Sequence, residues 1–211
     1  LKDGEIVAAA QEERFSREKN TSAFPIESIR FCLGFAGIEI SQISHVAYFE
    51  KPFLKFARVI TDHLIAWPFS WSAFYRSIPK WLTQRLSLPV TISEELGYEG
   101  PIHYLKHHLS HAASAFYPSG FDRAAIMTAD GVGEWATFSV GLGRGRDIQI
   151  EKEIHYPHSL GLLYTTVTTF LGFPAHGCEG QTMALASFGD PVRFKKAMHE
   201  IVKIREDGSF A

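Results

Sequence analysis

The sequence contains few cysteines and no long apolar run. Cys32 and Cys178 are the only two cysteines among 211 residues, and they stand far apart, one in an apolar helical run and one in a glycine-rich stretch. A disulfide framework is therefore not expected, and the composition favours a reducing cytoplasm. The longest apolar run is far shorter than the roughly 20 residues that a membrane-spanning helix needs, and no secretory signal pattern opens the chain.

A strong net charge is also missing. The 21 lysines and arginines are balanced by 23 acidic residues, which leaves a formal net charge of -2. This balance provides no long-range attraction to nucleic acid or to an anionic membrane, so neither is expected as a partner. Hydrophobic residues make up 45% of the chain, which is enough for the core of one large domain or two small ones and argues against disorder.

An initiator methionine and a complete first strand are lacking at the N-terminus. Asp3-Gly4 is typical of a two-residue hairpin turn with a second strand from Ile6 onward, yet almost nothing precedes the turn. The C-terminal residues 201–211 stop just after another turn. We therefore expect the chain, residues 1–211, to be the N-terminal portion of a longer protein.

Helical and extended patterns alternate along the chain, which is typical of an α/β fold. Extended segments are expected at 45–49, 102–105, 124–129, 136–143 and 148–156, and helices at 26–36, from 107 and at 160–171. Closely spaced aromatic residues between 51 and 87 predict amphipathic helices inserted between core strands. A membrane-surface or partner-binding helix is the alternative for this segment. The glycine-rich residues 177–189 predict a loop.

Three histidines directly follow the strand expected at 102–105. His107 and His111 are four residues apart, so on a helix they share one face and can hold one metal ion, whereas His108 points elsewhere. Helix capping or hydrogen bonding to the backbone is the alternative for these histidines. No acidic residue lies within the helix, which excludes the H-E-x-x-H pattern, and a third ligand must come from elsewhere.

The motif Asp130-Gly131-Val132-Gly133-Glu134 follows a buried strand and predicts a tight turn. Backbone N–H groups at such glycines can cradle a phosphate, while Asp130 suits a metal ion or a metal-bound water. A plain hairpin turn would use Asp-Gly equally well. Nearer the N-terminus, the charged residues 11–19 form either a solvated connector or a segment whose Arg14 and Lys19 reach an anionic ligand.

Six motifs, taken in order, resemble the N-terminal part of the NodU/CmcH-type carbamoyltransferases, which carbamoylate hydroxyl groups of nodulation factors and antibiotics. The motifs are Glu12-Glu13-Arg14-Phe15-Ser16-Arg17, Phe24-Pro25, the histidine segment 107–116, the segment 130–134, Ser159-Leu160-Gly161-Leu162-Leu163-Tyr164 and Glu179-Gly180-x-x-Met183-x-Leu185-Ala186. They cover nearly the whole chain, and the ordered set is far more specific than any single motif.

The resemblance implies an actin/hexokinase-like (ribonuclease H-like) α/β fold with a mixed sheet and flanking helices, related to the tRNA threonylcarbamoyl-transfer proteins. It implies that His107 and His111 are ligands of Fe²⁺, or alternatively Zn²⁺, and that both act in catalysis with Asp130. The third metal ligand and the adenylate-forming domain would follow Ala211. A metal ion in this position can polarise a carbamoyl carbonyl or bind a phosphate.

The resemblance also implies the substrates. Members of the family use ATP and carbamoyl phosphate to form carbamoyl-adenylate and pass the carbamoyl group to a hydroxyl of a small molecule or sugar. The residues expected to contact the nucleotide are Asp130, Gly131, Gly133, Arg14, Lys19 and Gly180. Mg²⁺ is a further candidate ion, and a homodimer is a candidate assembly.

Two residues depart from the usual Glu-Gly-Lys-x-Met-Gly-Leu-Ala segment of the family. Gln181 replaces the lysine and lacks its positive charge, and Ala184 replaces a glycine, which would restrict a position that needs positive φ. Alternatives to an ATP-dependent O-carbamoyltransferase are a non-catalytic metal- or nucleotide-binding remnant, a tRNA threonylcarbamoyl-transfer protein and a sugar kinase. Kinases lack the H-x-x-x-H pair, which favours the carbamoyl branch.

Overall fold

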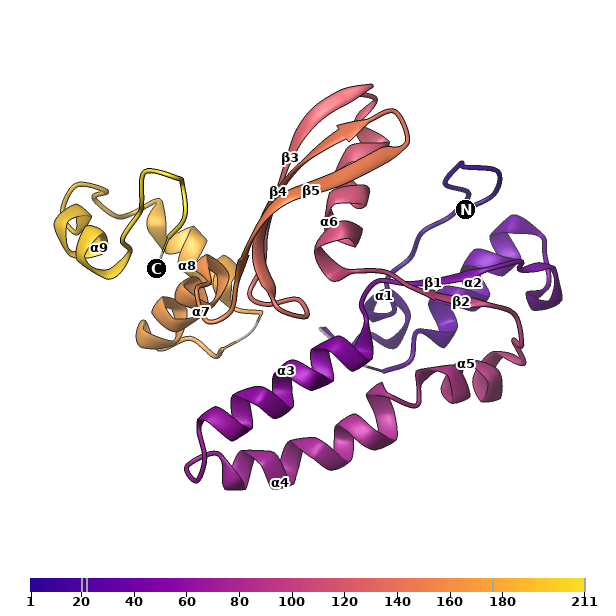
Figure 1. Ribbon diagram of the computed structural model, residues 1–211. Helices are drawn as coiled ribbons and strands as arrows, with labels where there is room; N and C mark the ends of the chain where they lie inside the picture. The colour runs from indigo at the N-terminus through magenta and orange to yellow at the C-terminus, as the bar shows by residue number, and fades with distance from the viewer. Residues whose placement is uncertain (20, 22, 176, 211) are drawn as a thin grey trace. The chain divides into compact units, whose positions relative to one another are not determined.

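The computed structural model describes residues 1–19, 21, 23–175 and 177–210, which fold into two compact units (Figure 1). Unit 1 comprises Leu1–Tyr48 and His63–Tyr104, and unit 2 comprises Phe49–Asp62 and Leu105–Ala211. The chain therefore passes from one unit to the other three times.

Unit 1 contains a short parallel strand pair and most of the helices of the N-terminal half. Strand β1 (Val46–Tyr48) pairs in parallel with β2 (Ile102–Tyr104). The helices are α1 (Glu13–Ser16), α2 (Ile26–Ala36), α4 (Trp71–Lys80) and α5 (Leu88–Leu96), with a 3-10 helix at Ile40–Gln42 and a π-helix at Trp81–Arg85. Helix α3 (Pro52–Ile65) begins in unit 2 and ends in unit 1. The aromatic segment between β1 and β2 is thus helical, and its helices extend past residue 87.

The N-terminal turn forms, but the strand expected after it does not. Asp3 and Gly4 have φ of 52° and 90°, and the backbones of Lys2 and Glu5 bond to each other across the turn. Residues 6–11 adopt no strand, since a strand is stable only beside a hydrogen-bonded neighbour and none of the described residues pairs with them. The strand had been expected because Asp3-Gly4 is typical of a hairpin turn.

Unit 2 is built on an antiparallel three-stranded meander. Strands β3 (Arg123–Ala129), β4 (Ala136–Arg144) and β5 (Asp147–His155) form the sheet, and helix α6 (His107–Phe116) packs beside it (Figure 1). A 3-10 helix at Tyr117–Ser119 follows α6, and α7 (Leu160–Phe170), α8 (Glu179–Ala186) and α9 (Lys195–Ile201) follow the sheet. The buried core consists of Ala112, Phe116 and Ile126, with Ala124, Ile148 and Ile150 packed against it.

Two further expectations need correction. Within the described parts of the chain, the five strands form two separate sheets, one parallel and one antiparallel, instead of one mixed sheet. The glycine-rich residues 177–189 contain helix α8 instead of a loop. The Glu179 carboxylate at the start of this helix accepts from Thr165 Oγ1 on α7 at 2.8 Å and from the Gly177 N–H before the helix at 2.7 Å, and these bonds hold the first turn in place. Ala184 lies inside this helix and not among the residues with positive φ.

The class of the fold is α/β, as predicted. None of the helices among the described residues is both long and apolar enough to cross a membrane.

Candidate metal centre

His107, His111 and Asp130 converge on one point in unit 2. His107 opens α6, His111 lies one turn later on the same face, and Asp130 follows β3 directly. His107 Nε2 is 2.8 Å from Asp130 Oδ2 and 3.0 Å from His111 Nε2, and His111 Nε2 is 3.8 Å from Asp130 Oδ2. The predicted histidine pair therefore shares a face, and Asp130 completes a group of three.

This geometry suits a divalent cation. The three ligand atoms all lie within 4.8 Å of one another, and their separations leave a point about 2.1 Å from each, which is a typical bond length from zinc to nitrogen or oxygen. Two histidines and one carboxylate on one side of an ion are also the ligands of many non-haem Fe²⁺ sites, where the other positions stay open. The chain thus supplies a third candidate ligand itself, in addition to any ligand expected after Ala211.

Asp130 remains ionised over a wide pH range. The hydrogen bond from His107 contributes most to lowering the pKa of the Asp130 carboxyl to about 2, and the Gly131 N–H, which donates to Oδ1 at 2.7 Å, adds to this effect against the influence of burial. Helix α7 packs on the same turn, because Ser159 Oγ donates to the Gly131 carbonyl at 2.6 Å. A Cβ at Gly161 would lie 2.6 Å from the Asp130 carbonyl oxygen, so this close approach requires glycine.

Glu134 holds the start of α6. The preceding residue, Lys106, makes no side-chain cap, and the two carboxylate oxygens of Glu134 each accept from the His107 N–H at 3.1 Å. Glu134 Oε1 also accepts from the Lys51 N–H at 2.9 Å, immediately before α3. A buried carboxylate at a helix N-terminus is favourable because it satisfies free N–H groups. The sequence motif contained Glu134, but its role depends on contacts that no local pattern reveals.

His108 has a structural role, as its position on the helix suggested. Its side chain is buried, with Nε2 bonded to the Ala136 carbonyl at 2.9 Å and Nδ1 to Thr128 Oγ1 at 2.6 Å. Because a carbonyl only accepts, Nε2 carries the proton and Nδ1 accepts from the threonine hydroxyl. Burial lowers the pKa of His108. This histidine anchors α6 to the sheet and leaves its neighbours free for the centre.

Gly131 and Gly133 lie beside the centre, but their N–H groups bond within the chain. The Gly131 N–H donates to Asp130 Oδ1, and the Gly133 N–H donates to the Ala136 carbonyl at 2.9 Å. A phosphate would have to replace these acceptors, and phosphate binding at this turn stays a prediction. A Cβ at Gly133 would lie 3.0 to 3.2 Å from Cβ, Cγ and Cδ2 of His107. Glycine at this position therefore makes room for the imidazole.

The other predicted contacts belong to other elements of the chain. Arg14 on α1 and Lys19 are exposed residues of unit 1, where the neighbouring Glu12 caps α2 by accepting from the Ser28 N–H at 2.9 Å. Gly180 is exposed on α8, and a Cβ there would meet nothing within 4 Å. None of the three belongs to the group formed by the two histidines and Asp130.

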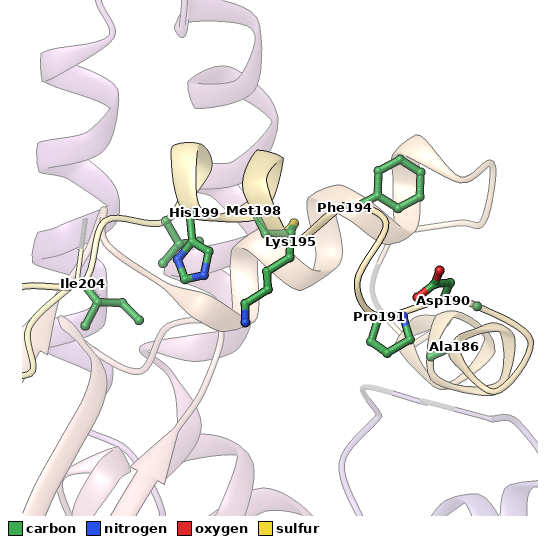
Figure 2. Close-up of a pocket in the computed structure, with 10 residues that line it drawn as sticks. Ala186, Asp190, Pro191, Phe194, Lys195, Met198, His199 and Ile204 are labelled. Atoms are coloured by element: carbon green, nitrogen blue, oxygen red, sulfur yellow. The ribbon is translucent and has the colours of Figure 1, made fainter.

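An apolar hollow lies between the end of α8 and α9 (Figure 2). Its volume is about 600 Å³, and its wall includes Phe194, Met198 and Ile204 together with Lys195 and His199. Lys195 and His199 are one turn apart on α9 and lie on the same side of it in Figure 2. None of the predicted site residues lines this hollow.

The family whose description is carbamoyltransferase N-terminus matches residues 1–211. The chain belongs to this family. The match covers every residue that carries the six motifs, and it confirms the resemblance to the N-terminal part of the carbamoyltransferases. Both the histidine pair and the segment 130–134 lie within the family match, and the fold brings them together.

Individual relatives agree with the family. An uncharacterised protein of Synechocystis is 40% identical over 218 residues, covering 100% of this chain and 35% of its own length. The nodulation protein NolNO of Sinorhizobium fredii is 32% identical and is covered over 30% of its length, and the nodulation protein NolO of Bradyrhizobium diazoefficiens is 30% identical over half of this chain. The chain therefore spans about a third of the length of the first two relatives.

Proposed function

We propose that the protein containing this chain is an ATP-dependent O-carbamoyltransferase. In this proposal, the carbamoyl group passes from carbamoyl phosphate, through carbamoyl-adenylate, to a hydroxyl of a small-molecule or sugar acceptor. Membership of the carbamoyltransferase family supports carbamoyl transfer. The similarity to the nodulation protein NolNO is compatible with a small-molecule or sugar hydroxyl as the acceptor. The observation that carries the proposal is the convergence of His107, His111 and Asp130.

We further propose that these three residues hold Fe²⁺, with Zn²⁺ as the alternative. A divalent metal bound there supplies a Lewis acid for a carbonyl or phosphoryl oxygen of the reactants. Asp130 contributes a negative charge that its low pKa preserves. The His111 side chain is 48% exposed, which leaves the centre accessible to a reactant, whereas the His107 side chain is only 13% exposed.

The transfer step that the site would serve is a substitution at the carbamoyl carbon. The acceptor hydroxyl oxygen forms a bond to that carbon, the bond from the carbon to the adenylate phosphate oxygen breaks, AMP leaves, and the hydroxyl proton is released to solvent. Glu134 and His108 keep α6 in place during this step through contacts to the backbone and the sheet. Arg14, Lys19, Gly131, Gly133 and Gly180 stay predicted contacts for the nucleotide, and Mg²⁺ stays a predicted companion of ATP.

The exchange of labelled pyrophosphate into ATP tests the proposed function in the full-length protein. We expect exchange when carbamoyl phosphate is present and none when it is omitted, because the reversible formation of carbamoyl-adenylate releases pyrophosphate. Absence of exchange in a protein that still binds metal would favour the non-catalytic remnant. Phosphorylation of a sugar by ATP without carbamoyl phosphate would favour the kinase alternative.

A further inference from the structure

The His107 imidazole presents one nitrogen to the metal centre and one to the protein interior. Nε2 lies beside His111 and Asp130. Nδ1 is buried and has no hydrogen-bond partner among the residues that the structure describes. Buried polar nitrogens are almost always partnered, so this atom calls for an explanation. Glu50 Oε2 lies 3.9 Å from it.

Glu50 is one of the most deeply buried side chains in the described part of the molecule. It is 1% exposed, and its Oε2 is 2.6 Å from Lys55 Nζ. A buried carboxylate remains ionised only when positive charge or hydrogen-bond donors compensate for the loss of water. Lys55 supplies a hydrogen-bond donor to this carboxylate, which also lies next to His107 Nδ1.

The backbone on both sides of Glu50 is fixed to the helix that carries His107. Before it, the Phe49 carbonyl accepts from Ser110 Oγ at 3.1 Å. After it, the Lys51 N–H donates to Glu134, the same carboxylate that holds the first N–H of α6. Residue 50 is thus held against the first turn of α6 by two contacts that do not involve its own side chain.

We propose that Glu50 is a positioning residue for the metal centre. When a cation replaces the hydrogen bond from His107 Nε2 to Asp130, the Glu50 carboxylate holds the imidazole proton on Nδ1, so that the Nε2 lone pair faces the metal beside His111 and Asp130. In this proposal a cation on Nε2 makes the Nδ1 proton more acidic, and the Glu50 carboxylate 3.9 Å away is the acceptor toward which that proton points. The inference rests on the proposed metal site, and it adds a residue that neither the motifs nor the family match assigns.

A purely local role for Glu50 is the competing explanation. Glu50 and Lys55 are five residues apart around the start of α3, and their ion pair could serve only to stabilise that helix. The two explanations predict different effects of substituting Glu50 and Lys55. A local ion pair needs both residues equally, whereas the positioning role needs the carboxylate far more than the lysine.

The test compares Glu50→Gln with Lys55→Gln in the full-length protein, with Zn²⁺ as the probe in competition with a coloured chelator. We expect Glu50→Gln to weaken Zn²⁺ binding by about 10- to 100-fold, the usual effect of losing a carboxylate behind a histidine ligand. Lys55→Gln keeps the Glu50 carboxylate and leaves a hydrogen-bond donor at position 55, so Zn²⁺ affinity should change by less than about threefold. Equal effects of the two variants, or unchanged affinity in Glu50→Gln, would overturn the inference.

A second measurement does not depend on the stability of a buried variant. In the unsubstituted Zn²⁺-loaded protein with ¹⁵N-labelled histidine, the His107 signals are identified by their loss in His107→Ala. We expect a proton on Nδ1 and a metal-shifted Nε2, and the opposite tautomer would refute the positioning role. If the unsubstituted protein bound Zn²⁺ no better than the His107→Ala/His111→Ala variant, the proposed metal site would itself be wrong, which is a result distinct from a failure of Glu50 alone.

Discussion

At the scale of single residues, Gly133 is as much a part of the metal centre as the ligands. A Cβ added there would lie only 3.0 Å from His107 Cβ, whereas a Cβ on Gly131 would meet Leu162 Cδ2 at an ordinary 3.7 Å. We therefore expect Gly133→Ala to displace the His107 ring and weaken metal binding by about tenfold or more. Gly131→Ala is the matched control and should retain metal. Metal content after dialysis measures both, and equal retention would show that the imidazole tolerates the extra methyl group.

The close approach of His107 and His111 could be predicted from sequence because its geometry is local. The four-residue spacing of His107 and His111 fixes their common face once the segment is helical. Glu134 and Glu50 could not be assigned in this way. Lys51 and Glu134 meet across 83 positions of the chain, and no periodicity encodes such a contact. For Glu50, the sequence offered one signal: it is an acidic residue that closely follows a strand, here β1.

At the scale of secondary structure, the sequence predicts elements well where several signals agree. Helix α2 has the predicted bounds, since Pro25 precedes it and Gly37, with φ of 65°, ends it. The meander β3–β5 lies within one or two residues of the predicted ranges. Helix α8 was missed because its glycines suggested a loop, while its stability comes from tertiary bonds to α7, among them Thr182 to Thr168 at 2.9 Å.

Glu12 offers a test of one such tertiary contact. Its carboxylate accepts from the N–H groups of Ser28 and Glu27 at the start of α2, and the Ser28 N–H contributes most to lowering the pKa of Glu12 below its ordinary 4.5. A carboxyl group whose pKa is lower in the folded state than in the unfolded chain stabilises the fold at pH values above its unfolded-state pKa. This contribution is lost as the pH falls below about 4.5 and through the folded-state pKa. Glu12→Gln should therefore lower the melting temperature at pH 7 by a few degrees and by less near pH 4.

The exposed Glu18 provides the control for this comparison. Glu18→Gln removes the same charge from the same segment, and its carboxylate caps no helix N-terminus among the described residues. Its melting temperature should follow that of the unsubstituted protein at both pH values. Thermal unfolding followed by circular dichroism is sufficient for the measurement. A difference between Glu12→Gln and the unsubstituted protein that stayed constant from pH 7 to pH 4 would argue against a role of the ionised carboxylate.

At the scale of the whole molecule, the residues of the proposed metal centre belong to unit 2 alone. Its parts come from three separate stretches, around residues 49–55, 107–111 and 130–134, and the sheet and α6 hold them together. Secondary-structure patterns predicted the α/β class but not the division into two units. Residues 49–62 belong to unit 2 through contacts with residues far along the chain, such as Lys51 with Glu134, and local patterns do not reveal such contacts. The family match extends over both units.

The last prediction concerns which step of the proposed reaction depends on His107 in the full-length protein. We expect His107→Ala to reduce carbamoyl transfer to the acceptor by at least about 100-fold, because a ligand of the proposed centre is lost. Pyrophosphate exchange should stay within about threefold of normal if carbamoyl-adenylate forms in a separate domain. The substitution leaves the His107 N–H free to bond with Glu134, so α6 keeps its start.

His155→Ala is the appropriate control, since His155 is an exposed histidine of the same unit that contacts Glu153 rather than the metal centre. Both activities should survive in it. Measuring exchange and transfer side by side on the three proteins separates the possible arrangements. Loss of transfer alone in His107→Ala places only the second step at the histidine centre. Equal loss of both steps would mean that adenylate formation also depends on this centre, and the assignment of the two steps to separate domains would have to be abandoned.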